Sequence, residues 1–278
     1  MMHLFYEVSQ ECSKITTKKY STSFSSAINL LHKDLRTPVY NIYGFVRFAD
    51  EIVDTFHGHD QTALLQQFKA ETYQAIERGI SLNPILHSFQ ITVNHYGIAR
   101  HLIDAFFTSM EQDLNKIEYD RHTYDEYIYG SAEAVGLMCL NIFCEGDIEK
   151  YLTLKQNAQS LGAAFQKVNF LRDVKADTQT LERMYFPDCN FLNFSEAQKR
   201  HIEADIQKDF EHAYEGIVKL PVKARFGVYV AYKYYMSLFQ KIKKVQAKRI
   251  MEERIRIPNC SKAMILAKAG VRSQFNML

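Results

Sequence analysis

The sequence of 278 residues contains no tryptophan and has only 11 glycines and 5 prolines. No stretch rich in proline, glycine or serine divides it, and no shift in composition marks a boundary. A chain of this length with 47% hydrophobic residues can bury one large core. Because helical periodicity recurs throughout the chain, we expect an all-α protein with a single domain over residues 1–278.

The chain also lacks an excess of charge of one sign. Lys and Arg number 34 and Asp and Glu 32, a net charge of +2 that does not indicate a nucleic-acid partner. The five cysteines form no C-x-x-C pair and no zinc spacing, which is typical of reduced thiols in a cytoplasmic protein. No apolar run approaches the ~18 residues of a membrane span. The first residues show no signal-peptide pattern, so we expect a cytoplasmic protein.

An acidic stripe occupies one face of the apolar run at residues 161–177. Gln166, Asn169, Asp173 and Asp177 follow one another at steps of three or four residues, which places them on one side of a helix. Acidic groups on an otherwise buried helix are unfavourable unless a partner compensates their charge. The stripe therefore indicates a bound cation.

A second aspartate pair ends the run at residues 38–56, for which Thr37-Pro38 is the expected helix start. Asp50 and Asp54 are four residues apart, with Tyr43 and Arg47 on the same face. Carboxylates ~6 Å apart repel by roughly 3 kcal/mol at an effective dielectric constant of ~20. Two such pairs facing one cavity would raise each other's pKa or hold a metal. We therefore predict opposed acidic faces that bind a diphosphate through Mg²⁺, which Mn²⁺ could replace.

Other polar segments allow two interpretations each. The hydroxyl-rich segment Tyr20–Ser26 could cap a helix start, which composition favours, or donate hydrogen bonds to phosphate oxygens. After a capping-box pattern at Thr123–Glu126, small residues at 130–136 indicate close approach of a helix or ligand, or tight packing alone. We interpret His57 and His59 as a solvated turn. A solvated face is expected for the scattered carboxylates Asp104, Glu111, Asp113 and Glu118.

Four segments, in this order, resemble motifs of the squalene/phytoene synthase family. They are Ser21–Phe24, Arg47–Asp54, Tyr127–Gly136 and Asn169–Asp177, and Glu182–Pro187 and Arg254–Ile257 resemble later segments of that family. The resemblance covers nearly the whole chain. Within the family, the short length and the wording of residues 161–177 are most similar to bacterial phytoene synthases.

The resemblance implies an all-α isoprenoid-synthase bundle whose central apolar cavity has the two acidic motifs at its mouth. It implies that Asp50, Asp54, Asp173 and Asp177 are catalytic and, with Asn169, bind the metal. The substrate contacts that it implies are Tyr20, Ser21, Thr22, Ser23, Phe24, Tyr43, Arg47, Tyr129, Gln166, Arg172, Arg183 and Tyr235. Two positions depart from the family pattern, because Tyr20 stands where some members have His and Ala176 replaces a frequent Glu.

The reaction implied is a head-to-head condensation of two geranylgeranyl diphosphates to phytoene. It would pass through a cyclopropyl (prephytoene) diphosphate, release two diphosphates and need no NADPH. A C30 synthase that makes dehydrosqualene or squalene from farnesyl diphosphate is the nearest alternative. A head-to-tail prenyltransferase and a non-catalytic helical assembly protein are more distant ones.

A basic segment near the end of the chain bears on membrane contact. Lys241–Arg256 is amphipathic and rich in Lys and Arg. It could be a solvated face, or it could contact an anionic membrane surface at the inner side of the membrane, and composition favours the former.

Overall fold

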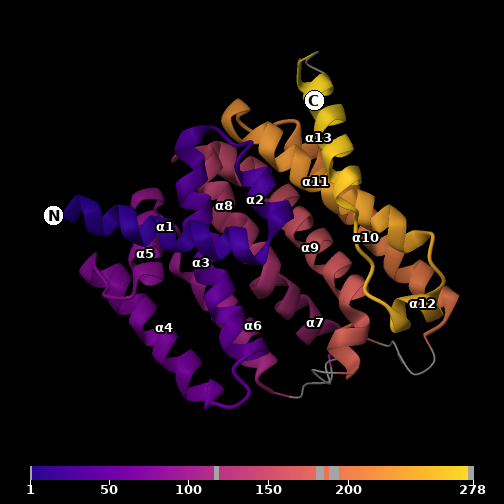
Figure 1. Cartoon of the computed structure of the whole chain (residues 1–278), viewed down its shortest axis with the longest axis horizontal. Coiled ribbons are helices and arrows are strands. Elements are labelled where there is room, and N and C mark those ends of the chain that lie inside the picture. Colours follow the sequence, from indigo (N-terminus) through magenta and orange to yellow (C-terminus); the bar gives the residue numbers. More distant parts are fainter. Residues whose placement is uncertain (1, 116–118, 180–184, 188–193, 275–278) are drawn as a thin grey trace.

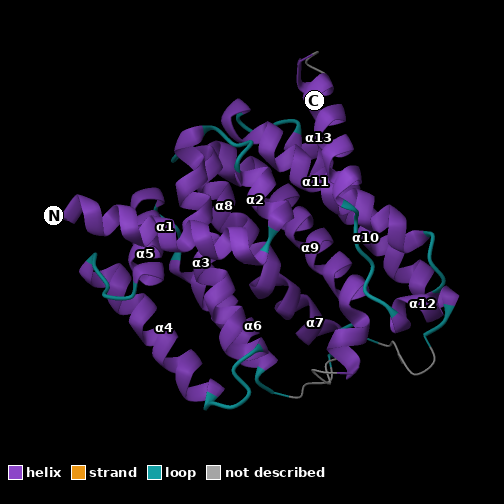
Figure 2. Ribbon diagram, viewed as in Figure 1, coloured by secondary structure: helices purple, strands orange, loops and turns teal. Residues whose placement is uncertain are grey.

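The computed structural model describes residues 2–115, 119–179, 185–187 and 194–274, without the side chains of 176–179, 259–261 and 271–274 (Figure 1). Every regular element in these residues is a helix, so the predicted all-α class is confirmed (Figure 2). The elements are α1 (Met2–Tyr20), α2 (Thr22–Ile28), α3 (Lys33–Asp54), α4 (Gln61–Arg78), α5 (Pro84–Tyr96), α6 (Arg100–Asp113), α7 (Arg121–Ile128), the π-helical turn η1 (Tyr129–Glu133), α8 (Ala134–Cys144), α9 (Ile148–Gln179), α10 (Glu196–Ile217), α11 (Val222–Lys243), α12 (Ala247–Glu252) and α13 (Asn259–Gln274).

Two predicted helix starts are wrong by a few residues. Helix α3 begins at Lys33, so Pro38 lies inside it. Proline at this position removes one backbone N–H donor from the helix, and packing of α3 against the core keeps the helix intact. Helix α7 is capped by Asp120, whose side chain accepts from the Thr123 N–H at 2.8 Å, and not by Thr123 itself. Aspartate is as good a cap as threonine, so residue types alone did not decide the boundary.

The small residues at 130–136 mark close backbone contacts around α9, as one of their two interpretations predicts. A Cβ on Gly130 would lie 2.2 Å from the Ala105 carbonyl oxygen of α6, and one on Gly162 would lie 2.7 Å from that of Ala132. A Cβ on Gly136 would lie 3.2 Å from the Ala158 carbonyl oxygen of α9. The long α9 therefore packs closely on η1 and α8, and these elements form one wall of the cavity described below.

The predicted turn at His57 and His59 can be compared directly with the structure. His57 and His59 are exposed in a turn after α3, which confirms the solvated-turn interpretation.

The stretch Arg121–Cys144 is long and apolar enough to span a membrane by composition, and half of the tested window is buried inside the protein. Burial of that kind is also found in core helices of soluble proteins, so the finding is weak support for a membrane span.

Candidate active site

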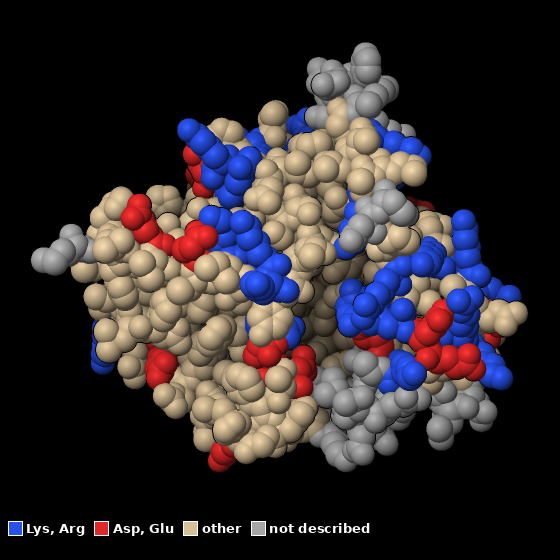
Figure 3. Space-filling model, viewed as in Figure 1, with Lys and Arg blue, Asp and Glu red and all other residues tan. Residues whose placement is uncertain are grey.

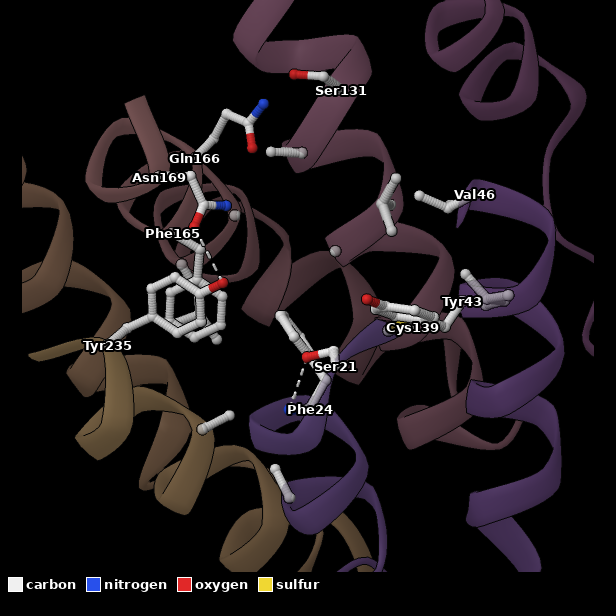
Figure 4. Close-up of a pocket in the computed structure, with 18 of the residues that line it drawn as sticks. Ser21, Phe24, Tyr43, Val46, Ser131, Cys139, Phe165, Gln166, Asn169 and Tyr235 are labelled. Carbon is white, nitrogen blue, oxygen red and sulfur yellow. Dashed lines mark hydrogen bonds between the residues drawn. The ribbon is translucent and has the colours of Figure 1, made fainter. Parts of the chain in front are cut away.

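One cavity of about 550 Å³ lies among α2, α3, α8, α9 and α11. The face in Figure 3 is hollowed near its centre, with Lys and Arg on both sides of the hollow. Figure 4 shows side chains from these helices pointing into the cavity. The predicted site residues that line it are Tyr20, Ser21, Phe24, Tyr43, Arg47, Asp50, Asp54, Gln166, Asn169, Arg172, Asp173 and Tyr235.

Three predicted substrate contacts do not line the cavity. Thr22 is exposed, and its Oγ1 accepts a hydrogen bond from Lys262 Nζ at 3.2 Å. Ser23 and Tyr129 are partly buried outside the lining. On a helix, neighbours of a lining residue point in other directions, so a motif contains residues that do not reach the site. Arg183 and the side chain of Asp177 lie outside the described residues.

The two acidic helix faces meet at this cavity. Asp50 and Asp54 come from α3 and Asp173 from α9, more than 100 residues away in sequence, and all three line the same space. Together with the amide oxygen of Asn169 they form a set of hard oxygen donors of the kind that Mg²⁺ prefers. No group of three His, Cys, Asp or Glu side chains within the described residues is already close enough to hold a metal. The donor set fits a metal that takes its remaining ligands from a substrate and water.

Asp173 is held between two guanidinium groups. Arg172 NH2 lies 2.5 Å from Asp173 Oδ2, and Arg254 Nε lies 2.7 Å from Asp173 Oδ1. Arg254 follows α12 and also lines the cavity, so the last part of the chain contributes to the site. The segment Arg254–Ile257 resembles a family motif, but no role for Arg254 could be predicted from the sequence. The carboxylate is thereby neutralised by protein cations.

Arg47 presents a buried donor at the cavity. Its guanidinium stacks over the Tyr20 ring, 4.4 Å from the ring centroid, and pairs with Glu51 and Asp50. Its Nε is buried and, among the described residues, has no hydrogen-bond partner. A buried guanidinium N–H without an acceptor is unfavourable. This donor therefore fits an anionic ligand that would supply the missing acceptor.

Aromatic side chains form the next layer of the cavity (Figure 4). The rings of Phe165 and Tyr235 stack with centroids 3.9 Å apart, and Phe24 meets both edge to face. The Tyr235 hydroxyl donates to Asn169 Oδ1 at 3.3 Å. Burial raises the pKa of Tyr43 to about 12, partly offset by its hydrogen bond with Ser21. The phenols are therefore neutral at physiological pH, and their ring faces can stabilise positive charge.

The hydroxyl-rich segment Tyr20–Ser26 both caps a helix and reaches the cavity. Ser21 caps α2, since its Oγ accepts from the Phe24 N–H at 3.2 Å. The same residue lines the cavity, where it meets Tyr43. A helix start therefore lies directly at the site.

One site feature was missed in the sequence. Asp113 was expected on a solvated face, but it is 9% exposed and lines the cavity with Tyr127 and Tyr185. Asp104 and Glu111 are solvated as expected, and Glu118 lies outside the described residues. Asp113 is the last residue of α6, and only the packing of that helix end against α7 turns it inward. The spacing of carboxylates in the sequence contains no signal for this.

Most of the remaining lining is apolar. It includes Leu31, Leu140, Phe143, Leu154, Ile217 and Leu220. Burial raises the pKa of the Cys139 thiol, which also lines the cavity, to about 12, so this thiol is uncharged and unreactive. An apolar chain can therefore be enclosed beside the charged groups.

Fold and site together define a class of protein: an all-helical bundle around a largely apolar cavity, part of whose wall carries aspartates and arginines. The sequence profile of the squalene/phytoene synthase family matches residues 17–260. The chain therefore belongs to the squalene/phytoene synthase family, whose enzymes join prenyl diphosphates head to head.

Individual relatives agree with this family. The chain is 25% identical to a phytoene synthase of Arthrospira platensis over 96% of this chain and 94% of that protein. It is 28% identical to a 4,4'-diapophytoene synthase of Staphylococcus haemolyticus over 72% of this chain and 69% of that protein. A solved dehydrosqualene synthase in complex with a ligand has the same fold, with a TM-score of 0.82 at 20% identity over 97% of this chain and 98% of that chain.

Proposed function

We propose that this protein is a Mg²⁺-dependent transferase that condenses two geranylgeranyl diphosphates to phytoene. The observation that carries the proposal is the composition of the cavity. Asp50, Asp54 and Asp173 line it together with Arg47, Arg172 and Arg254, and most of the remaining wall is aromatic or aliphatic. This combination suits a ligand with a diphosphate at one end and a long hydrocarbon at the other.

The metal would be held by the carboxylates that converge from α3 and α9. Asp50 and Asp54 offer one pair of ligands, and Asp173 with Asn169 offers the opposite set, to which the sequence motif adds Asp177. When bound, Mg²⁺ would supply Lewis-acid neutralisation of the leaving diphosphate. Mn²⁺ could substitute for it, and the proposed reaction has no step that calls for NADPH.

The basic side chains would bind the diphosphate directly. Within the part of the chain that the structure describes, the buried Arg47 Nε–H has no acceptor, and a phosphate oxygen would supply one. Arg254 and Arg172 now hold Asp173, and they could turn to a diphosphate once a cation takes over that carboxylate. Asp173 would then be compensated by the metal in place of the two arginines, so its charge would stay neutralised.

The wall beyond the charged groups would handle the hydrocarbon and the carbocation. Ionisation of an allylic diphosphate gives a cation that water would quench, so an enclosed apolar wall protects it. The stacked rings of Phe165 and Tyr235, with Phe24 across them, offer π faces to that charge. The double bond of the second substrate can then attack, and the neutral phenols do not compete as charged nucleophiles.

Chain length is the finer part of the proposal. Geranylgeranyl diphosphate is favoured because the similarity to a phytoene synthase extends over 96% of this chain. A specific second candidate is a C30 product from farnesyl diphosphate, because the diapophytoene and dehydrosqualene synthases have C30 products in their names. The volume and shape of the cavity with two substrates bound would distinguish the two.

The test is product identification with purified protein. It would be incubated with Mg²⁺ and the C15 or C20 prenyl diphosphate, with and without NADPH, and the extracted products analysed by chromatography and mass spectrometry. We expect phytoene from the C20 donor without NADPH, and loss of product when EDTA removes the metal. A C30 hydrocarbon from the C15 donor alone would establish the second candidate instead.

Two further outcomes would overturn the proposal more broadly. A product that retains its diphosphate would indicate a head-to-tail prenyltransferase. Absence of diphosphate release with every donor would indicate a non-catalytic assembly protein.

We also propose a cytoplasmic location with peripheral contact at the inner membrane face. The proposed product is a hydrocarbon that water does not dissolve, and a nearby bilayer would receive it. The basic segment Lys241–Arg256 supports attraction to anionic lipids. Cosedimentation with anionic and neutral vesicles would measure this contact.

A further inference from the structure

A buried carboxylate joins two tyrosines on the cavity wall. Asp113 Oδ2 accepts a hydrogen bond from the Tyr127 hydroxyl at 2.8 Å, and its Oδ1 accepts one from the Tyr185 hydroxyl at 3.1 Å. The three residues come from the end of α6, from α7 and from the segment after α9, and all three line the cavity. Their convergence is therefore a product of tertiary structure alone.

The two phenols form part of an aromatic wall. The Tyr185 ring stacks on Phe170 with centroids 4.0 Å apart and planes 7° apart, and the Tyr127 ring lies 5.0 Å from the Tyr185 ring. Phe170 follows Asn169 directly on α9, and it too lines the cavity. Phe170 thus joins this wall to the acidic motif in the sequence, although the wall itself consists of aromatic rings and one carboxylate.

Each phenol has a single proton, and at this wall both protons are directed at one carboxylate. The tyrosine oxygens can then present only lone pairs elsewhere, and they cannot donate to a diphosphate in the cavity. Burial, and after it the charge of Asp113, raises the pKa of Tyr127 well above its usual value, so this phenol keeps its proton. An oriented O–H dipole whose negative end faces a developing cation stabilises that cation.

We propose that Asp113 is a positioning residue for the carbocation stage of the reaction, because it orients Tyr127 and Tyr185 with their protons directed at its own carboxylate. The inference rests on the proposed prenyl condensation. It assigns to this wall the stabilisation of positive charge after the diphosphate has left, and it assigns diphosphate binding to the arginines. Loss of the orientation should therefore affect the fate of the cation more than the binding of substrate.

The test compares two aspartates of the same helix that each accept a tyrosine hydroxyl. Asp113→Asn keeps the shape of the side chain but offers an N–H₂ group, so one hydrogen bond must reverse and a phenol proton is released toward the cavity. Asp104→Asn is the matched control, because Asp104 accepts from Tyr73 at the solvated side of α6 and does not line the cavity. The measurements are kcat, KM, unfolding temperature and the identity of every product.

For Asp113→Asn we expect hydrocarbon formation to slow by about 10-fold or more, with KM changed by less than about twofold. The fraction of turnovers that end as cyclopropyl diphosphate or as water-quenched alcohol should rise. Asp104→Asn should retain the wild-type kinetics and product ratio. An unchanged product ratio in Asp113→Asn, or a change confined to KM, would overturn the inference.

A second variant addresses the case in which Asp113→Asn folds poorly. Tyr185→Phe keeps the ring that stacks on Phe170 and removes only the hydroxyl, so it should shift the products in the same direction. If Asp113 acts through the tyrosines, Asp113→Asn should add little in a Tyr127→Phe/Tyr185→Phe background. If the effects of Asp113→Asn and of the two tyrosine substitutions simply add, Asp113 does not act through the tyrosines.

A readout without substrate separates this inference from the proposed function. Tyrosine labelled with ¹³C at Cζ reports the hydroxyl environment by NMR, and Tyr→Phe variants assign the signals of Tyr127 and Tyr185. Asp113→Asn should move both signals, while Asp104→Asn should leave them in place. Unmoved signals would exclude the positioning role, whereas a wild-type protein inactive with every donor would exclude only the proposed function.

Discussion

At the scale of single residues, the site is organised by charges that compensate one another before any ligand arrives. Asp173 is neutralised by Arg172 and Arg254, and Asp50 is paired with Arg47. Carboxylates placed this way avoid the mutual repulsion that the two D-x-x-x-D pairs would otherwise produce. The arrangement explains how acidic helix faces can line a largely apolar cavity in a stable protein.

The role of the first aspartate motif can be tested by one isosteric change. Asp50→Asn should lower turnover by about 100-fold or more, since a neutral amide no longer attracts the cation that activates the diphosphate. The unfolding temperature should change little, because Asp50 is partly exposed and its long ion pair with Arg47 contributes little to stability. Steady-state kinetics and thermal unfolding measure the two effects.

The control for this prediction lies on the same helix. Asp34 is exposed in the first turn of α3, away from the cavity, and Asp34→Asn should leave turnover unchanged. Near-normal turnover of Asp50→Asn would contradict the assignment of Asp50 to the metal site.

At the scale of elements, close packing around η1 and α9 sets the shape of the cavity wall. Sequence reasoning found the small-residue segment and the acidic end of α9, because both are local patterns. It placed the start of α7 wrongly, since Asp120 and Thr123 are equivalent caps in sequence. It placed the start of α3 wrongly because Pro38, a typical first residue of a helix, lies inside this one. The π-helical turn at Tyr129–Glu133 has no recognised sequence signature and is decided by packing.

The contact between α6 and η1 gives a stability prediction. Gly130→Ala would place a Cβ 2.2 Å from a backbone oxygen of α6, which cannot move aside as a flexible side chain can. We expect destabilisation of about 1–3 kcal/mol, seen as a lower midpoint in thermal or urea unfolding.

Gly270 on α13 provides the comparison, because a Cβ there would meet nothing within 4 Å. Gly270→Ala should be neutral or stabilise the protein by up to ~1 kcal/mol, through better helix propensity. Equal effects of the two changes would show that the close approach at Gly130 is not needed for stability.

At the scale of the whole molecule, the cavity joins residues from the first helices to the segment after α12. Ser21, Asp50, Asp113, Asp173 and Arg254 line the same space although they span most of the chain. Binding at such a site should couple to global unfolding, because a ligand holds several elements together.

This coupling gives a prediction for ligand and metal together. An unreactive prenyl thiolodiphosphate at 100 times its Kd should stabilise the protein by about 2.7 kcal/mol, which raises the unfolding temperature by roughly 5–10 °C for a chain of this size. We expect most of this shift to vanish with EDTA, because the carboxylates would then face an uncompensated diphosphate. Differential scanning calorimetry measures it, and a shift of the same size without Mg²⁺ would contradict the proposed metal role.

The sequence by itself determined the helical class and the family, and most of the site residues that it predicted line the cavity, because helix periodicity places residues three and four apart on one face. Only the tertiary structure decided which of these faces meet. It turned Asp113 inward to two tyrosines, brought Arg254 to Asp173, and left Thr22, Ser23 and Tyr129 outside the cavity. The reason is that these contacts join segments up to 81 residues apart, whose relative placement depends on how whole helices pack and not on any local pattern.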